Sequence, residues 1–449
     1  MTKLIASDRL AIVVGIGATG LSVARHLTAR GDAFVMVDSR VEPPGLVELQ
    51  RTLPGTEVEL GGFNSVTLGA ADRLIVSPGV SVAHPALQAA AAQGVAVTGD
   101  IALFMAAARA PVVAITGSNG KSTVTTLVGE MALAAGKNVG IGGNLGCPAL
   151  DLLADDRDLY VLELSSFQLE LVEQLNAEVV TVLNVSADHM DRYATLLDYH
   201  RAKHRIFTGA KKVVVNRDDM LSQPLLPTSV QSFSFGLGKP DFNGFGLLTE
   251  QGESCLAYEF EALLPVAQLG IRGRHNVANA LAALALGHAV GLPRDAMLQA
   301  LRHFTGLPHR CQTVADSKGV TWINDSKATN TGATIAALQG LANTGDMNVI
   351  LIAGGQSKGQ DFSVLKSAVK GRVKVAVLIG EDAALLSQCL TTETNVLCAD
   401  SMTAAVSLAA EYACVGDTVL LSPACASFDM FSGFAERGDS FAAAVAALC

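Results

Sequence analysis

Aromatic residues, charged residues and basic runs are all scarce in this sequence. Aromatics make up 5% of the 449 residues and charged residues 16%, and the formal net charge is −10. A protein that follows nucleic-acid phosphates needs a basic surface, so we expect no nucleic-acid partner. A local basic pocket for a small anionic substrate remains compatible with this charge.

Segments for export or membrane insertion are also lacking. The opening MTKLIASDRL has no long apolar core and no small-residue cleavage site, so we expect no signal peptide. The apolar stretch 279–289 is too short to cross a bilayer. The sequence therefore predicts a cytoplasmic protein that does not contact membranes.

Paired cysteines are missing as well. The eight cysteines are at positions 147, 255, 311, 389, 398, 414, 425 and 449, with no C-x-x-C pair. We expect small buried hydrophobic side chains in a reducing compartment rather than a zinc site or a nucleophile.

Alanine, valine, leucine and glycine are abundant instead, which suits parallel sheets covered by helices. Strand patterns alternate with helix patterns in three blocks, which we expect to form an α/β protein of three domains at 1–99, 100–306 and 307–449. The first and third are expected to be Rossmann-like, and the central one a parallel-sheet mononucleotide-binding domain. The segment 232–268 is predicted to form a small antiparallel appendix of that domain.

The apolar runs predict strands in all three blocks. They cover 10–14, 33–37, 73–76, 95–98, 112–115, 159–164, 179–183, 212–215, 349–353, 375–379 and 418–422. Helices are expected up to residue 30 in the first block and at 85–93 and 275–290.

The sequence TGSNGKST at 116–123 follows an apolar strand and opens a helix. Such a loop turns backbone N–H groups towards phosphate oxygens, a lysine neutralises the outer phosphates, and a hydroxyl binds Mg²⁺. Lys121 and Ser122 are the residues for these tasks. The standard loop has a glycine where this chain has Ile115, so the loop is a shortened version.

The pattern Gly15-x-Gly17-x-x-Gly20, followed by Asp38, is a complete dinucleotide fingerprint. NAD is one interpretation. Another is a sugar nucleotide, because the same loop binds any diphosphate and Asp38-Ser39-Arg40 combines an acid for hydroxyls with a guanidinium. A third is that the glycines only permit a tight turn.

Polar residues also follow other strands of the central block. Glu163 ends a strand where parallel sheets place catalytic groups, and is either an Mg²⁺ ligand or an acid at a helix N-terminus. His189 follows a strand within the acidic cluster DHMD. Lys203, judged by spacing alone, is an ordinary solvated lysine.

The third block contains three further polar loops. NDSKATN at 324–330 is either a binding loop or a turn with side-chain caps. GGQSK at 354–358 and SPACAS at 422–427 each follow a strand, and both could hold a small carboxylate.

Eight motifs in order resemble those of the Mur ligases. They are TGSNGKST, LELSSFQLE, NVSADHMDRY, HRAK, RHNVANALAA, GLPHRCQ, NDSKATN and LLSPACASFD. The resemblance spans the chain and accounts for the shortened phosphate loop. Its third-block motifs are most similar to those of the member that adds D-glutamate to UDP-N-acetylmuramoyl-L-alanine in peptidoglycan precursor synthesis. It implies a monomeric ATP-dependent ligase that works through an acyl phosphate.

The resemblance also implies roles for individual residues. Lys121, Glu163, His189 and Lys203 are the implied catalytic residues. Two Mg²⁺ ions are implied, held by Ser122, Glu163, His189 and a carbamylated Lys203. The implied ATP contacts are Gly117, Ser118, Asn119, Gly120, Lys121, Ser122, Thr123, Asn276, Asn279, Arg310 and Asp325.

The two other substrates have their own implied contacts. Those for the UDP-sugar are Gly17, Ala18, Thr19, Asp38, Ser39, Arg40, Ser77, Gly79 and Asn144, which favours a UDP-sugar over NAD at the fingerprint. Those for D-glutamate are Thr329, Lys358, Ser427 and Phe434. A sibling ligase and a non-catalytic nucleotide-binding regulator remain the alternatives.

Overall fold

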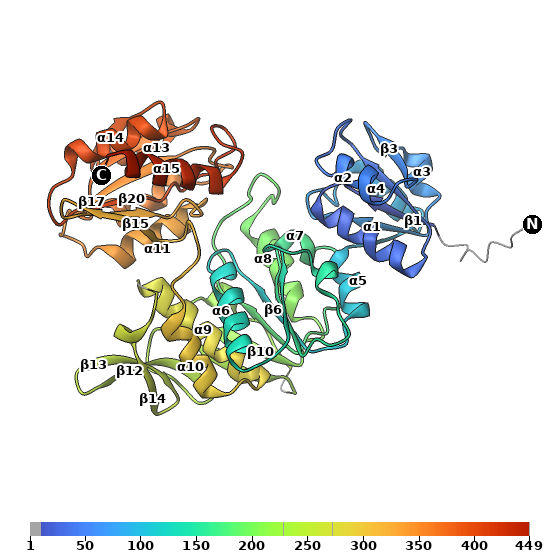
Figure 1. Cartoon of the computed structure of the whole chain (residues 1–449), viewed down its shortest axis with the longest axis horizontal. Coiled ribbons are helices and arrows are strands. Elements are labelled where there is room, and N and C mark those ends of the chain that lie inside the picture. Colours follow the sequence, from blue (N-terminus) through green and yellow to red (C-terminus); the bar gives the residue numbers. More distant parts are fainter. Residues whose placement is uncertain (1–9, 228, 272, 449) are drawn as a thin grey trace, which may run out of the picture.

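The computed structural model describes residues 10–227, 229–271 and 273–448. In this part of the chain three sheets follow one another, and Figure 1 shows the first and third on either side above the central one. The segment 1–9, for which we expect no signal peptide, lies outside the described residues. No helix in the described part is long and apolar enough to cross a membrane.

The first sheet is fully parallel. In spatial order its strands are β3 (Glu57–Leu60), β2 (Phe34–Asp38), β1 (Ala11–Val14), β4 (Arg73–Val76) and β5 (Ala96–Thr98). Its helices are α1 (Ala18–Arg30), α2 (Leu46–Thr52), α3 (Ser65–Gly69) and α4 (Pro85–Ala92). The order reverses at β1, so the loop after β1 lies at a topological switch point.

The central sheet is mixed. In spatial order its strands are β14 (Glu261–Pro265), β13 (Glu253–Tyr258), β12 (Gly244–Glu250), β11 (Gln231–Phe235), β10 (Lys212–Asn216), β9 (Val179–Val182), β6 (Val112–Thr116), β8 (Leu159–Glu163) and β7 (Val139–Gly143). Its helices are α5 (Asp100–Ala107), α6 (Lys121–Ala134), α7 (Ser166–Leu169), α8 (Leu196–His204), α9 (Arg274–Val290) and α10 (Arg294–His303).

The expected antiparallel appendix is formed by strands β12, β13 and β14, and it continues the parallel part of the central sheet. Strands β12, β13 and β14 do pair antiparallel, but β11 pairs parallel with both β10 and β12, so all are one continuous sheet. The physical reason is burial: Phe233, Phe235 and Phe245 pack into the core beneath α9. Their spacing in a glycine-punctuated segment concealed this continuity.

The third sheet is parallel except at one edge. In spatial order its strands are β15 (Gln312–Ser317), β16 (Val320–Asn324), β20 (Thr418–Leu421), β17 (Val349–Gly354), β18 (Val373–Ile379) and β19 (Asn395–Cys398), with β15 antiparallel to β16. Its helices are α11 (Thr331–Leu341), α12 (Lys366–Val369), α13 (Ala383–Leu390), α14 (Met402–Tyr412) and α15 (Phe434–Leu448).

The cysteines correct one expectation. The described ones are all free, but Cys147, Cys398 and Cys414 are exposed rather than buried. Cys398 ends the edge strand β19, and the other two lie in loops, so no neighbouring element covers them. Cys449 lies outside the described residues.

Candidate functional site

The phosphate loop connects β6 to α6 and turns on Gly120. Gly120 has a φ of 82°, a left-handed conformation that favours glycine. Lys121 is the first residue of α6, and its Nζ donates hydrogen bonds to the carbonyls of Gly117 (2.8 Å) and Ser118 (3.0 Å). Burial lowers the pKa of Lys121, which the nearby Glu163 and Asp188 oppose. The Lys121 side chain thus folds back over its own loop.

Next to the loop, Ser122 and Glu163 form a buried pair. The Ser122 hydroxyl donates to Glu163 Oε2 over 2.6 Å, and Asn144 Nδ2 donates to Oε1 over 2.6 Å. Burial alone would raise the pKa of Glu163, but the Lys121 ammonium and these hydrogen bonds hold it below its usual value. Glu163 is therefore an ionised carboxylate beside the phosphate loop. Arg310 Nη2 also donates to the Ser122 oxygen (2.6 Å).

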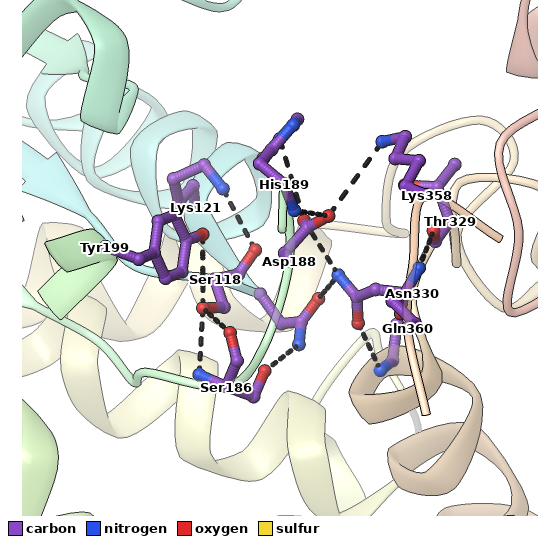
Figure 2. Close-up of polar contacts among 12 residues, drawn as sticks. Ser118, Lys121, Ser186, Asp188, His189, Tyr199, Thr329, Asn330, Lys358 and Gln360 are labelled. Atoms are coloured by element: carbon purple, nitrogen blue, oxygen red, sulfur yellow. Dashed lines mark hydrogen bonds and ion pairs between the residues drawn. The ribbon is translucent and has the colours of Figure 1, made fainter. Parts of the chain in front are cut away.

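Asp188 lies at the centre of the polar contacts in Figure 2. It accepts a hydrogen bond from Asn330 Nδ2 (3.1 Å), and its carboxylate is 3.9 Å from Lys358 Nζ. His189 has a positive φ of 58° and its Nε2 lies 3.8 Å from Asp188 Oδ2. Asp188 thus connects the central domain to two loops of the third.

Lys203 is buried, at 1% exposure, rather than solvated as its spacing suggested. Its Nζ donates to the carbonyl of Gly117 (2.8 Å) and lies 4.4 Å above the centre of the Tyr199 ring. Burial holds the pKa of Lys203 well below its ordinary value, and the Lys121 charge lowers it further. Burial beneath the phosphate loop therefore shifts Lys203 towards the neutral amine.

Two cavities collect most of the predicted site residues. The smaller, of about 280 Å³, is lined by the phosphate loop, by Glu163, His189 and Asn144, and by all the residues implied for D-glutamate: Thr329, Lys358, Ser427 and Phe434. The larger, of about 600 Å³, is lined by Asn276, Asn279, Thr123 and Asp325 among others. Asn119, Gly120, Arg310 and Lys327 line both, so the two spaces meet at the phosphate loop.

The larger cavity contains an unusual carboxyl group. Asp325 accepts hydrogen bonds from Ser422 Oγ (2.9 Å) and from the Cys311 N–H (3.1 Å). Burial nevertheless raises the pKa of Asp325 to about 7. Asn279 Nδ2 donates to Asn276 Oδ1 (3.1 Å) across the same cavity wall.

The residues implied for the UDP-sugar lie mostly elsewhere, at the switch point of the first sheet. Asp38 is buried there and accepts hydrogen bonds from the Ile16 N–H (2.7 Å) and from Arg40 Nη2 (2.7 Å). Among the described residues that line the two cavities, Asn144 alone comes from this implied set. A Cβ at Gly20 would collide with the Gly15 carbonyl, whereas a Cβ at Gly17 would meet no atom within 4 Å. Gly20 is thus required for packing, and the space over Gly17 is open.

One side chain connects this first region to the central site. Arg192 Nη1 donates to the carbonyl of Pro78 (2.9 Å), between the implied contacts Ser77 and Gly79. Arg192 Nη2 donates to Glu170 Oε2 (2.7 Å). The guanidinium lies 4.0 Å from the centre of the Phe167 ring, and this ring packs against His189.

Sequence reasoning gave no individual role to several residues at the site. Asp188 and Asn330 belong to motifs that were recognised, and their position after strand ends was the available signal. Lys327 lies 3.9 Å over the Phe434 ring, and burial lowers its pKa to about 8. No spacing rule pairs Asp188 with Asn330 or Lys327 with Phe434, because each contact joins residues that are far apart in the chain.

Family models match three consecutive parts of the chain. The Mur ligase MurD-like N-terminal domain matches residues 9–99, the Mur ligase middle domain 115–287, and the Mur ligase glutamate ligase domain 309–425. The UDP-N-acetylmuramoylalanine--D-glutamate ligase of Pseudomonas savastanoi pv. phaseolicola is 59% identical, with 99% of this chain and 100% of that protein covered. The ligase of the same name from Pseudomonas aeruginosa is 58% identical, with 99% of each covered.

Solved structures share the fold at low identity. UDP-N-acetylmuramate-alanine ligase MurC from Thermotoga maritima has a TM-score of 0.60 at 18% identity, covering 98% of this chain and 100% of that one. A pseudomurein peptide ligase type C from Methanothermus fervidus has a TM-score of 0.60 at 19% identity, covering 92% and 96%. With the family models matching all three domains and relatives this similar over the full length, the chain belongs to the Mur ligase family.

Proposed function

We propose that this chain uses ATP to join D-glutamate to UDP-N-acetylmuramoyl-L-alanine, in peptidoglycan precursor synthesis. The observation that carries the proposal is the smaller cavity. There the phosphate loop faces Thr329, Lys358, Ser427 and Phe434, so a nucleotide phosphate and an amino acid would meet in one space. The full-length similarity to ligases named for this reaction supports the choice of substrates.

In the proposed reaction the terminal carboxylate of UDP-N-acetylmuramoyl-L-alanine attacks the γ-phosphorus of ATP, and ADP leaves. The amine of D-glutamate then attacks the acyl phosphate. The tetrahedral intermediate loses the amine proton and expels phosphate, which leaves the amide. Catalysis here is positioning and charge neutralisation, so cations must surround the phosphates. Lys121 would exchange its loop carbonyls for the β- and γ-phosphates, while Arg310 and Lys327 face the same space.

The residues beside the loop fit Mg²⁺. Ser122 and the ionised Glu163 offer hard oxygen donors 2.6 Å apart. Among the described residues no group of three or more His, Cys, Asp or Glu forms a complete metal cage. Mg²⁺ is usually held by one or two protein carboxylates and completes its shell with phosphate oxygens and water. When bound, Mg²⁺ would neutralise charge on the transferring phosphoryl group. We propose Ser122 and Glu163 for one ion, and His189 with Lys203 for a second.

For Lys203 we propose carbamylation. A carbamate forms only on a neutral amine, and burial of Nζ under Gly117 shifts Lys203 towards that form. The modification would replace an ammonium, which repels Mg²⁺, with an anionic oxygen donor.

We further propose that the first domain, residues 1–99, holds the UDP-sugar, residues 100–306 hold ATP, and residues 307–449 hold D-glutamate. The open space over Gly17 at the start of α1 would admit a diphosphate. All these groups come from one chain, so we propose a monomer. We also propose that it acts in the cytoplasm.

The test is a phosphate-release assay with ATP, UDP-N-acetylmuramoyl-L-alanine and a panel of amino acids. We expect phosphate release only when UDP-N-acetylmuramoyl-L-alanine and D-glutamate are both present with ATP. Preference for another amino acid would indicate a sibling ligase, and release independent of the acceptors would contradict the proposal. No phosphate release under any combination would indicate a nucleotide-binding regulator.

A further inference from the structure

Arg437, on α15, is a buried cation that the reaction above does not use. Its side chain is 1% exposed, and it is the bulkiest of the fully buried side chains among the described residues. Its guanidinium makes five hydrogen bonds. They run to Ser326 Oγ (3.0 Å), Ser326 O (2.8 Å), Gly354 O (3.4 Å), Cys425 O (3.1 Å) and Ala426 O (3.2 Å). These acceptors are all uncharged.

The acceptors belong to three loops that follow adjacent strands. Ser326 follows β16, Gly354 ends β17, and Cys425 and Ala426 follow β20, which lies between those two strands in the sheet. Each loop continues into a residue that lines the smaller cavity: Thr329, Lys358 and Ser427 respectively. The helix that carries Arg437 begins at Phe434, which lines the same cavity.

The loops are also tied to one another around this guanidinium. Gln356 and Ala426 exchange backbone hydrogen bonds of 3.1 and 2.9 Å. Ser326 Oγ donates to the carbonyl of Phe434 (2.8 Å). Gly355 has a φ of 127°, and a Cβ there would collide with the Ala426 carbonyl. The backbones therefore meet closely, and the planar guanidinium is the group that occupies the point between them.

A buried charge without a carboxylate partner is costly to keep. Burial lowers the pKa of Arg437 to about 10, so it is still a cation at neutral pH. An apolar side chain could fill the same volume, but it would remove the guanidinium donors from the carbonyls of Ser326, Gly354 and Cys425, one in each loop. The arrangement is thus specific to a side chain with several donors in a fixed plane.

We propose that Arg437 is a positioning residue for the amino-acid site: it fixes the three loops at the spacing that Thr329, Lys358 and Ser427 need to hold a dicarboxylic amino acid. This inference rests on the proposed function. Arg437 acts through the loops. The affinity for D-glutamate should therefore depend on Arg437, whereas formation of the acyl phosphate should not.

The experiment compares Arg437→Lys and Arg437→Gln with Arg372→Lys and Arg372→Gln. Arg372 is the matched control, because its guanidinium also donates to backbone carbonyls of the third domain, those of Ala342, Ser367 and Ala368. For each variant we would measure the thermal midpoint and the KM values for all three substrates. Exchange of labelled ADP into ATP, with UDP-N-acetylmuramoyl-L-alanine but no D-glutamate, reports the first step alone.

We expect both Arg437 variants to raise the KM for D-glutamate by about tenfold or more, since small displacements of positioning groups are costly. The other KM values and the exchange rate should stay within about twofold, and the Arg372 variants should match the wild type. An unchanged KM for D-glutamate in a folded Arg437 variant would overturn the inference. An equal change in all three KM values and in the exchange rate would also overturn it. Failure of both Arg437 variants to fold would overturn it too, because Arg437 would then serve the stability of the whole domain.

The wild type separates this inference from the proposed function. If the wild type accepts another amino acid, the proposed substrate is wrong, and the same comparison is made with the amino acid that it does accept. If the wild type catalyses neither exchange nor amide formation, both proposals fail. If it uses D-glutamate and the Arg437 variants do so equally well, only the inference fails.

Discussion

Arg310 donates a hydrogen bond to the Ser122 hydroxyl over 2.6 Å, although 188 positions separate the two residues in the chain. The same hydroxyl donates to Glu163, so the start of the third domain contacts the pair proposed to hold Mg²⁺. Asn330 makes a second link of this kind through Asn119 and Asp188. The third domain is thus already engaged with the phosphate loop, and the loop's chemistry depends on both domains.

The first prediction concerns Lys121→Ala. Turnover should fall about a thousandfold, because the variant lacks the charge that acts mainly on the transferring phosphoryl group. UDP-sugar binding, measured by calorimetry, should survive, since its proposed contacts are mainly in the first domain. Lys137→Ala is the control, as Lys137 is exposed near the end of the same helix. Near-normal turnover in Lys121→Ala would rule out this loop as the ATP site.

Much of the fold was predictable because the signals are local. Runs such as 112–115 and 349–353 are apolar and end in glycine loops, and they form β6 and β17. Strand β7 (Val139–Gly143) was missed because three of its five residues are glycine, and β3 (Glu57–Leu60) because two are glutamate on an edge. Short strands of this kind are held by their neighbours rather than by their own composition.

The site was predictable only where a motif carries the chemistry within itself. TGSNGKST places Lys121 and Ser122 on one loop, but the burial of Lys203 arises from packing against Tyr199 and Gly117. The contacts of Asp188 with Asn330 and Lys358 join residues far apart in the chain. Arg437 gave no signal at all, because helix periodicity does not distinguish a buried arginine from an exposed one.

A second prediction concerns Lys358→Ala. Lys358 lines the smaller cavity and lies 3.9 Å from Asp188, so its ammonium can hold one carboxylate of D-glutamate. The KM for D-glutamate should rise by about tenfold to a hundredfold, as for a charged hydrogen-bonding partner, and far more than the KM for ATP. Lys370→Ala, at an exposed position of the same domain, should match the wild type. An equal rise in both KM values would mean that Lys358 is not an amino-acid anchor.

A third prediction concerns the pKa of Lys327. Burial and the neighbouring charges of Arg310 and Lys121 lower this pKa to about 8. Below that pH the amine is positively charged, which strengthens the binding of nucleotide phosphates. Above it, binding must take up a proton, so the Kd for a non-hydrolysable ATP analogue should rise, approaching tenfold per pH unit. Calorimetry from pH 7.5 to 9.5 measures this.

The matched variant is Lys327→Arg, which keeps the charge across that range because arginine does not titrate there. It should flatten the rise in Kd, whereas Lys318→Arg, at an exposed turn of the same domain, should leave it unchanged. A rise of the same size in Lys327→Arg would assign the titration to another group, such as Lys121.

The last prediction concerns the modification of Lys203. The unmodified ammonium would be repelled by Mg²⁺, whereas a carbamate supplies an oxygen ligand of the kind that Mg²⁺ prefers. Lys203→Ala should therefore be nearly inactive, and added acetate or formate should restore part of its activity by occupying the vacated oxygen position. Lys203→Arg should not be rescued, because its bulk and charge remain in the buried site under Gly117.

Lys211→Ala serves as the control for Lys203, since Lys211 is exposed and pairs only with Glu178 among the described ion pairs. It should keep full activity and show no response to acetate or formate. If carboxylates rescue neither Lys203 variant, and a crystal structure with Mg²⁺ bound contains an unmodified amine, the carbamate has no role here. Rescue of Lys203→Ala alone would instead identify the missing group as an anionic oxygen, since acetate and formate restore the oxygen but not the amine.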